Sequence, residues 1–243
     1  MKKLFASFGW ALLLFPLISF AGIRNVAEIG TALYDSENRQ VGPFNTITSA
    51  GAFDVFVTMG TKESLRLEGD KDVISKIETV VENGNLKIRT KKNAERLWGS
   101  SFGKVRVYIT AKALKGVHLS GSGNIKVDGN VKANDFSSRI SGSGTIRLNL
   151  NAEKYSAGVS GSGELIVSGS AEIVDIAISG SGDFQGEKLR TSNANIKISG
   201  SGDVSIHADE ILNAAVSGSG NIMYAGNAQV NSRTSGSGKV KRL

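Results

Sequence analysis

Short runs of alternating apolar and polar residues recur along the chain from residue 117 to its last residue. One run, Val117-His118-Leu119, stands just before the tetrapeptide Ser-Gly-Ser-Gly, and another, Asn124-Ile125-Lys126-Val127, follows it. Alternation with a period of two predicts strands that bury one face and expose the other. The tetrapeptide occurs seven times with similar flanks, beginning at Ser120, Ser141, Ser160, Ser179, Ser199, Ser217 and Ser235.

The tetrapeptides are almost evenly spaced, at intervals of 21, 19, 19, 20, 18 and 18 residues. A near-constant period of this length is typical of solenoid proteins. Two short strands, the tetrapeptide and a short return segment make one rung, which is too short to contain a βαβ crossover. We therefore predict an all-β fold, a parallel β-helix (β-solenoid) whose repeats occupy residues 117–243.

Glycine and serine runs also form flexible linkers, which is the alternative interpretation of the tetrapeptide. Linkers are not normally spaced at one rung and bracketed by β-branched residues. We therefore interpret each tetrapeptide as a bend between two strands. Its glycines would permit a positive φ or let neighbouring coils approach closely.

Residues 41–116 carry a less regular β pattern and predict irregular N-terminal coils of the same domain. Runs of β-branched and aromatic residues between glycines predict strands near 44–47, 52–59, 64–68, 77–82, 85–89 and 105–109. Asn83-Gly84 predicts a tight hairpin turn. The one helix candidate is a single turn from Asp70 to Lys76, with Asp70 or Asp72 as its N-cap.

Residues 1–21 have the pattern of a secretory signal peptide, because Lys2 and Lys3 precede an apolar run that ends at Ala21. A transmembrane anchor is the alternative, but the apolar run contains Pro16 and is shorter than the ~20 residues of a spanning helix. Residues 22–40 lack periodicity and predict an N-terminal arm, followed by a single domain over 41–243. We expect a periplasmic, cell-surface or secreted protein with no transmembrane segment after cleavage.

Composition narrows the partners that such a protein would have. The chain has no cysteine, so an exported protein of this sequence depends on packing and β-ladders, without disulfides. The formal net charge is +7, and it falls to +5 when Lys2 and Lys3 are removed. This mild excess, together with export, argues against a nucleic-acid partner. It still permits attraction to acidic surface glycans or anionic lipid headgroups.

Few residues are suited to catalysis. His118 and His207 are the only histidines, and the alignment of the rungs places both on outward positions. Phosphate-binding loops, dinucleotide fingerprints and zinc-ligand spacings do not occur in the sequence. We therefore assign no catalytic residue and no organic cofactor.

The residue that follows each tetrapeptide belongs to an outward ladder in which Glu164, Asp183 and Asp203 are consecutive. Parallel stacking would place successive carboxylates ~4.8 Å apart. A bridging cation would relieve their repulsion, so a Ca²⁺ site is one hypothesis. A solvated acidic stripe, or one paired with basic residues of flanking rows, is the other. Those basic residues are His118, Arg139, Lys197 and Arg233 on one side and Lys126, Arg147 and Lys241 on the other.

The longest irregular insertion, from Lys91 to Gly103, combines cationic and aromatic residues among glycines and serines. Such residues stack on sugars or contact a protein partner when they are exposed, although a loop tryptophan more often packs on a nearby strand. The candidate ligand-binding residues here are Lys91, Lys92, Arg96, Trp98 and Phe102.

Several segments, in order, resemble the GIN domain family, the head domain of autotransporter adhesins. They are Phe44–Ile47 with Gly51–Val57, Leu67–Asp70, Glu82–Ile88 and Leu119–Ile125. The resemblance covers roughly residues 41–243. It implies an exported, right-handed β-helical domain with an adhesin-like role, and it supplies no catalytic residues. No segment after Lys239 resembles the membrane barrel of a complete autotransporter.

Three functions remain open at this point. The first is a non-enzymatic, adhesin-like envelope module that presents a long β-face to a glycan or protein ligand. The second is a polysaccharide lyase or hydrolase, because β-helices can carry such sites. The third is a structural solenoid that forms homo-oligomers through its C-terminal edge, which Lys239, Lys241 and Arg242 would oppose.

Overall fold

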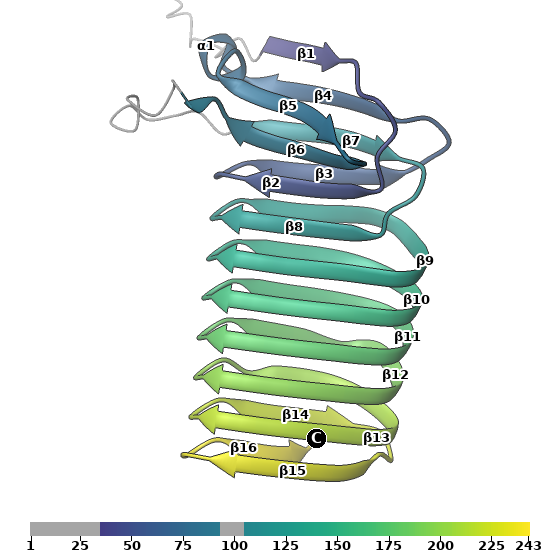
Figure 1. Ribbon diagram of the computed structural model, residues 1–243, viewed down its shortest axis with the longest axis vertical. Helices are drawn as coiled ribbons and strands as arrows, with labels where there is room; N and C mark the ends of the chain where they lie inside the picture. The colour runs from purple at the N-terminus through teal and green to yellow at the C-terminus, as the bar shows by residue number, and fades with distance from the viewer. Residues whose placement is uncertain (1–34, 93–104) are drawn as a thin grey trace, which may run out of the picture. The chain divides into compact units, whose positions relative to one another are not determined.

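The computed structural model describes residues 35–92 and 105–243, which belong to one compact unit from Leu33 to Leu243. From residue 116 onward this unit is a right-handed stack of parallel coils (Figure 1). Each coil runs along one face, bends at a tetrapeptide and returns along the other face. Its strands are β8 (Gly116–Gly121), β9 (Asn124–Gly142), β10 (Thr145–Gly161), β11 (Glu164–Gly180), β12 (Asp183–Gly200), β13 (Val204–Gly218), β14 (Asn221–Ala225), β15 (Gln229–Ser235) and β16 (Lys239–Arg242).

Equivalent residues of successive coils lie over one another, so the alternation in the sequence becomes continuous apolar rows. Ile146 pairs with Leu165, and Leu165 pairs with Phe184. All three side chains are buried, while their polar neighbours face outward. The apolar rows of the two faces meet in one core. The predicted parallel β-solenoid is therefore confirmed.

The tetrapeptides form the bends at one edge of the stack, as predicted. The first glycine of each has a positive φ, for example +114° at Gly161. The second glycine lies against the coil before it, and a β-carbon on Gly144 would lie only 2.1 Å from the Gly123 carbonyl oxygen. The two glycines thus permit two different features, a left-handed backbone and close stacking.

The N-terminal coils stack in an order that differs from their order in the chain. Strands β2 (Thr46–Ala50) and β3 (Asp54–Met59) pair directly with β8 and β9. The next coil outward consists of β6 (Asn85–Thr90) and β7 (Arg106–Ala111). Antiparallel strands cover this coil, namely β4 (Ser64–Gly69) on β7, β5 (Ile77–Glu82) on β6 and β1 (Asp35–Arg39) on β4.

Two local predictions in this region are confirmed. The helical turn α1 (Lys71–Ile74) is capped by the Asp70 side chain, which accepts hydrogen bonds from the backbone N–H groups of Asp72 and Val73. Asn83 and Gly84 both have positive φ values, 50° and 73°, and join β5 to β6 in a tight hairpin. Both features depend on neighbouring residues alone.

The structure describes only the last residues of the predicted N-terminal arm. Its residues 35–39 form β1, which pairs with β4 along its whole length. Their polar side chains are compatible with a strand at the outer edge, where one neighbour suffices. The predicted signal peptide and the rest of the arm lie outside the described residues. Within 35–92 and 105–243, no helix is long and apolar enough to cross a membrane.

At the C-terminal end of the stack, β15 pairs with β13 and β16 pairs with β14. In the part of the chain that the structure describes, neither strand has a second partner. The exposed Lys239, Lys241 and Arg242 lie on this last coil, as expected. Homo-oligomerisation through this edge stays a prediction.

Candidate functional site

The outward side chains of the strands that precede the tetrapeptides form one continuous face, which we call the groove face. Three rows run along it, each with one residue per coil. The serine row comprises Ser120, Ser141, Ser160, Ser179, Ser199, Ser217 and Ser235. The central row comprises His118, Arg139, Gly158, Ala177, Lys197, Ala215 and Arg233. The amide row comprises Ser137, Ser156, Asp175, Asn195, Asn213 and Asn231.

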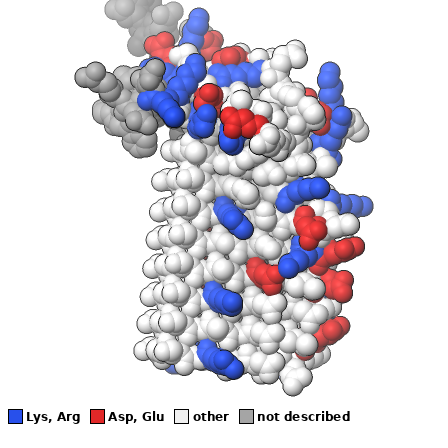
Figure 2. Space-filling view, in the orientation of Figure 1, with Lys and Arg blue, Asp and Glu red and all other residues white. Residues whose placement is uncertain are grey.

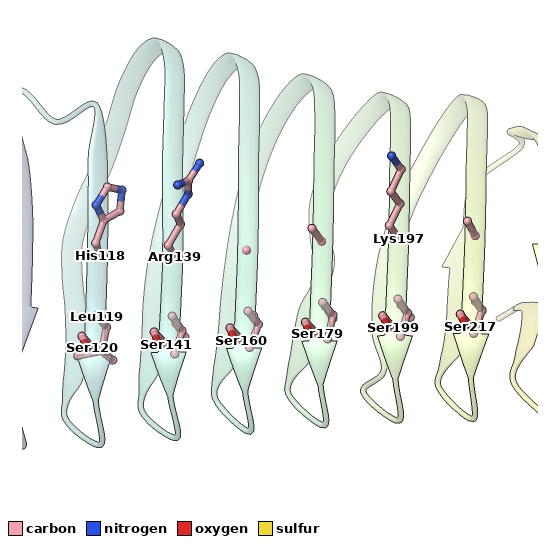
Figure 3. A pocket seen from close by; sticks show the side chains of 18 of the residues that line it. His118, Leu119, Ser120, Arg139, Ser141, Ser160, Ser179, Lys197, Ser199 and Ser217 are labelled. Atoms are coloured by element: carbon pink, nitrogen blue, oxygen red, sulfur yellow. The ribbon is translucent and has the colours of Figure 1, made fainter.

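A surface groove of about 850 Å³ follows the serine and central rows from β8 to β15. A second hollow adjoins it between the central and amide rows. In the close-up view, Ser120 to Ser217 line up beside the bends, while His118, Arg139 and Lys197 lie one step back along the strands (Figure 3). Because the coils are parallel and in register, the serines repeat every ~4.8 Å. The groove therefore offers a regular array of exposed hydroxyls.

The central row alternates between cations and very small residues. Arg139, Lys197 and Arg233 are exposed, and none of them forms an ion pair with any described residue. Gly158 and Ala177 lie between the first two cations, so the backbone itself forms the groove floor there. Figure 2 shows basic side chains spaced down this face, while acidic ones gather toward the edge opposite the bends.

His118 lies at the N-terminal end of the central row and is half-buried, more enclosed than the sequence predicts. Its Nε2 atom is 3.2 Å from the Ser137 hydroxyl. Burial, together with the nearby Arg139 guanidinium, holds the pKa of His118 below its usual value. The ring is therefore largely uncharged at neutral pH.

The amide row is a hydrogen-bonded ladder along the other side of the groove. The side-chain amide of Asn195 donates to Asp175 Oδ1 at 2.9 Å, that of Asn213 to Asn195 Oδ1 at 2.9 Å and that of Asn231 to Asn213 Oδ1 at 3.1 Å. Asp175 is the only carboxylate in the three rows, and Lys154 Nζ lies 3.2 Å from its second oxygen. The groove therefore retains an unbalanced positive charge.

The acidic ladder lies on the opposite face, after the bends. The Glu164 carboxylate accepts a hydrogen bond from the Gln185 amide. Asp183 accepts from the Asp203 backbone N–H at 2.9 Å, and Asp203 accepts from Asn221. Among the described residues, no three His, Cys, Asp or Glu side chains are grouped to hold a metal ion. These carboxylates are engaged in joining coils, and Ca²⁺ binding here stays a prediction.

The expectation that basic rows pair with this acidic ladder is wrong for the row before the tetrapeptide. The bend places His118, Arg139, Lys197 and Arg233 on one face and the carboxylates on the other. On the acidic side, Lys126 pairs with Asp128 at 2.8 Å and not with the ladder. The second histidine, His207, lies 3.0 Å from Asp209 Oδ1 and is remote from the groove rows.

The insertion that the sequence singles out connects β6 to β7. Arg96, Trp98 and Phe102 lie outside the described residues. Lys91 Nζ donates to the Ser75 carbonyl oxygen at 2.7 Å, and Lys92 is exposed. A ligand-binding role for this segment therefore stays a prediction.

Sequence reasoning missed the amide ladder and the groove. The signal for the ladder was present, because asparagine recurs four residues before the tetrapeptide at Asn195, Asn213 and Asn231. A recurrent carboxamide in parallel coils predicts stacked side chains that hydrogen-bond to one another.

Solved structures of bacterial proteins share this fold. One is a "putative adhesin" from Bacteroides fragilis NCTC 9343, with a TM-score of 0.79 and 23% identity, over 86% of this chain and 97% of that one. Another is a "putative lipid binding protein" from Parabacteroides distasonis ATCC 8503, with a TM-score of 0.71 and 23% identity, over 86% and 96% of the two chains. A third, a "putative adhesin" from Parabacteroides merdae ATCC 43184, has a TM-score of 0.68 and 22% identity, over 88% and 98%.

Identities this low support a common fold and leave function open. Among curated proteins, none matches this chain. The family model described as "Putative auto-transporter adhesin, head GIN domain" matches residues 43–228. That range includes the N-terminal coils and most of the groove face. The chain therefore belongs to the GIN domain family.

Proposed function

We propose that the protein is an exported, non-enzymatic, adhesin-like module that binds an envelope or cell-surface ligand along the groove face. The observation that carries this proposal is the groove itself, in which hydroxyls, amides and unpaired cations repeat over successive coils. A surface of this kind offers many weak, regularly spaced contacts. It suits an elongated glycan or an extended protein segment better than a small molecule.

The described residues offer little for catalysis. Neither histidine belongs to a complete triad among the described residues, since His118 contacts the Ser137 hydroxyl without an orienting carboxylate and His207 contacts Asp209 without a hydroxyl nucleophile. The carboxylates of the acidic ladder are engaged with Gln185 and with backbone or side-chain donors. Polysaccharide lyases and hydrolases need converging acids and bases. This geometry favours binding without turnover.

The test is a glycan array and an envelope-protein pull-down with the purified protein and with Ala177→Trp, which fills the groove floor. We expect ligands retained by the unmodified protein to be lost with Ala177→Trp. Ser122→Trp, on the exposed bend, serves as the control. Equal binding by Ala177→Trp would place the ligand elsewhere. Depolymerisation of a polysaccharide that is lost in Asp183→Ala would establish an enzyme instead.

A further inference from the structure

The central row carries three cations whose spacing is set by the stacked coils. Their charge and their arrangement in one row indicate the class of ligand. We infer that the groove face binds a linear polyanionic glycan, with its acidic groups paired to Arg139, Lys197 and Arg233. The inference rests on the proposed function and adds the chemistry of the ligand.

The first support is the lack of internal partners for these three cations. Some basic side chains of the coils reach carboxylates, as Lys126 does with Asp128 and Lys154 with Asp175, whereas others outside the groove, such as Arg147, also form no ion pair with a described residue. The three groove cations are distinguished because they lie in one row of the same face. Arg139, Lys197 and Arg233 have no carboxylate within ion-pair distance among the residues that the structure describes, although all three are exposed. A row of like charges without counter-ions attracts a polyanion, and ions released on binding add to the affinity.

The second support is the spacing of the charges. Arg139 and Lys197 are three coils apart, and Lys197 and Arg233 are two coils apart. At the usual strand separation these intervals are about 14 and 10 Å along the axis of the coils. A linear polyanion laid along the groove would pass the three cations in turn, so its acidic groups could pair with them one after another.

The third support is the character of the floor and the walls. Gly158, Ala177 and Ala215 are too small to fill the space between the cations, so sugar rings can lie there. The serine row on one side and the amide row on the other supply donors and acceptors for sugar hydroxyls. Because the Asn195–Asn231 ladder is hydrogen-bonded along its length, this wall is pre-organised.

Other polyanions fit less well. Apart from the half-buried His118 at one end, the three rows contain no aromatic side chain on which nucleobases could stack. A lipid headgroup would find the same three cations but would leave most hydroxyls and amides of the flanking rows without the hydrogen-bond partners that a chain of sugars supplies. The glycan is therefore the occupant that the whole face matches.

The experiment measures binding of the purified protein to a heparin-derived dodecasaccharide by calorimetry at several salt concentrations. The groove variant is Arg139→Ser/Lys197→Ser/Arg233→Ser. The control, Arg147→Ser/Lys188→Ser/Lys241→Ser, removes the same charge from exposed positions outside the three rows. Neutral dextran and phosphatidylglycerol vesicles are the comparison ligands. Circular dichroism and thermal melting verify that each variant is folded.

We expect the groove variant to bind the dodecasaccharide at least ~10-fold more weakly and to lose roughly 2–3 units of slope in log K against log salt. The control should lose less than ~3-fold, because general attraction alone changes. Equal losses in both variants would overturn the inference, as would binding to vesicles or dextran but not to the dodecasaccharide. In those cases, if Ala177→Trp still abolishes the binding of another ligand, the proposed function stands. If Ala177→Trp blocks no ligand, the proposed function fails as well.

Discussion

Gly144 is the fourth residue of its tetrapeptide, where the preceding coil leaves no room for a side chain. A β-carbon there would lie 2.1 Å from the Gly123 carbonyl oxygen and 2.5 Å from Leu119 Cδ2. Gly144→Ala must therefore push two coils apart, and we expect it to lower the free energy of unfolding by about 1–3 kcal/mol. Guanidinium denaturation gives the value. The exposed neighbour Ser143, changed to alanine, should stay within ~0.5 kcal/mol of the unmodified protein. Similar losses in both variants would contradict the close-stacking explanation.

His118 makes the stability of the groove face sensitive to mild acid. Its pKa in the folded protein is lowered by burial and by Arg139, whereas the unfolded chain has the ordinary value of about 6.5. Below neutral pH the unfolded state therefore binds more protons than the folded state, and stability falls as the pH drops through 6.5 toward the lower folded pKa. His118→Gln removes this contribution. Urea denaturation between pH 8 and 5 should show a smaller loss for the variant. Parallel curves would mean that His118 does not titrate differently on folding.

The N-terminal covering strands are joined by one partly buried arginine. Arg39 of β1 donates to the backbone carbonyl of Ile77 at 2.7 Å and to that of Ile74 at 3.0 Å, which joins β1, α1 and β5. Arg39→Met keeps much of the apolar contact but leaves both carbonyls without this donor. We expect a loss of about 1–3 kcal/mol in denaturation experiments. Glu37→Gln is the matched control, because that exposed ion pair should contribute less than ~1 kcal/mol. Equal effects would assign the stabilisation to the ion pair.

Elements defined by neighbouring residues could be predicted from the sequence, whereas elements defined by distant pairing could not. The Asp70-capped turn and the Asn83-Gly84 hairpin follow from local chemistry. The insertion of the β2–β3 coil between β6–β7 and β8–β9 has no local signal, because every one of these strands has a similar apolar alternation. The same is true of β1, whose polar residues match an arm as well as an edge strand.

For the molecule as a whole, the repeat predicts the architecture but leaves the composition of each face unresolved. Counting from the tetrapeptide aligns rows correctly, since Ser160 pairs with Ser179 and Gly161 with Gly180. The count does not reveal that the bend sends flanking rows to opposite faces. For that reason the row of Glu164, Asp183 and Asp203 stands near the row of Arg139 when the repeats are aligned, but lies on the other face of the molecule. The groove arises only when the rows are placed on one surface.

Each coil contacts mainly its two neighbours, so removing one whole period should leave a foldable protein. Deleting residues 160–178 joins Val159 to Ser179 and preserves the register, because Ser160 and Ser179 occupy the same place in adjacent coils. We expect a cooperative melt close to that of the full chain. Deleting 160–177 leaves one extra residue in the strand, which turns one flank to the wrong face, and should melt at a clearly lower temperature.

The whole-period deletion also moves Lys197 one coil closer to Arg139, so that their separation falls from about 14 to about 10 Å. If binding depends on the match between the spacing of the cations and that of the ligand's acidic groups, the dodecasaccharide should bind with altered affinity while the fold is retained. If the tetrapeptides were flexible linkers, the protein would tolerate both deletions equally. Equal melting temperatures for the two deletions would therefore contradict the stacked-coil register on which the groove depends.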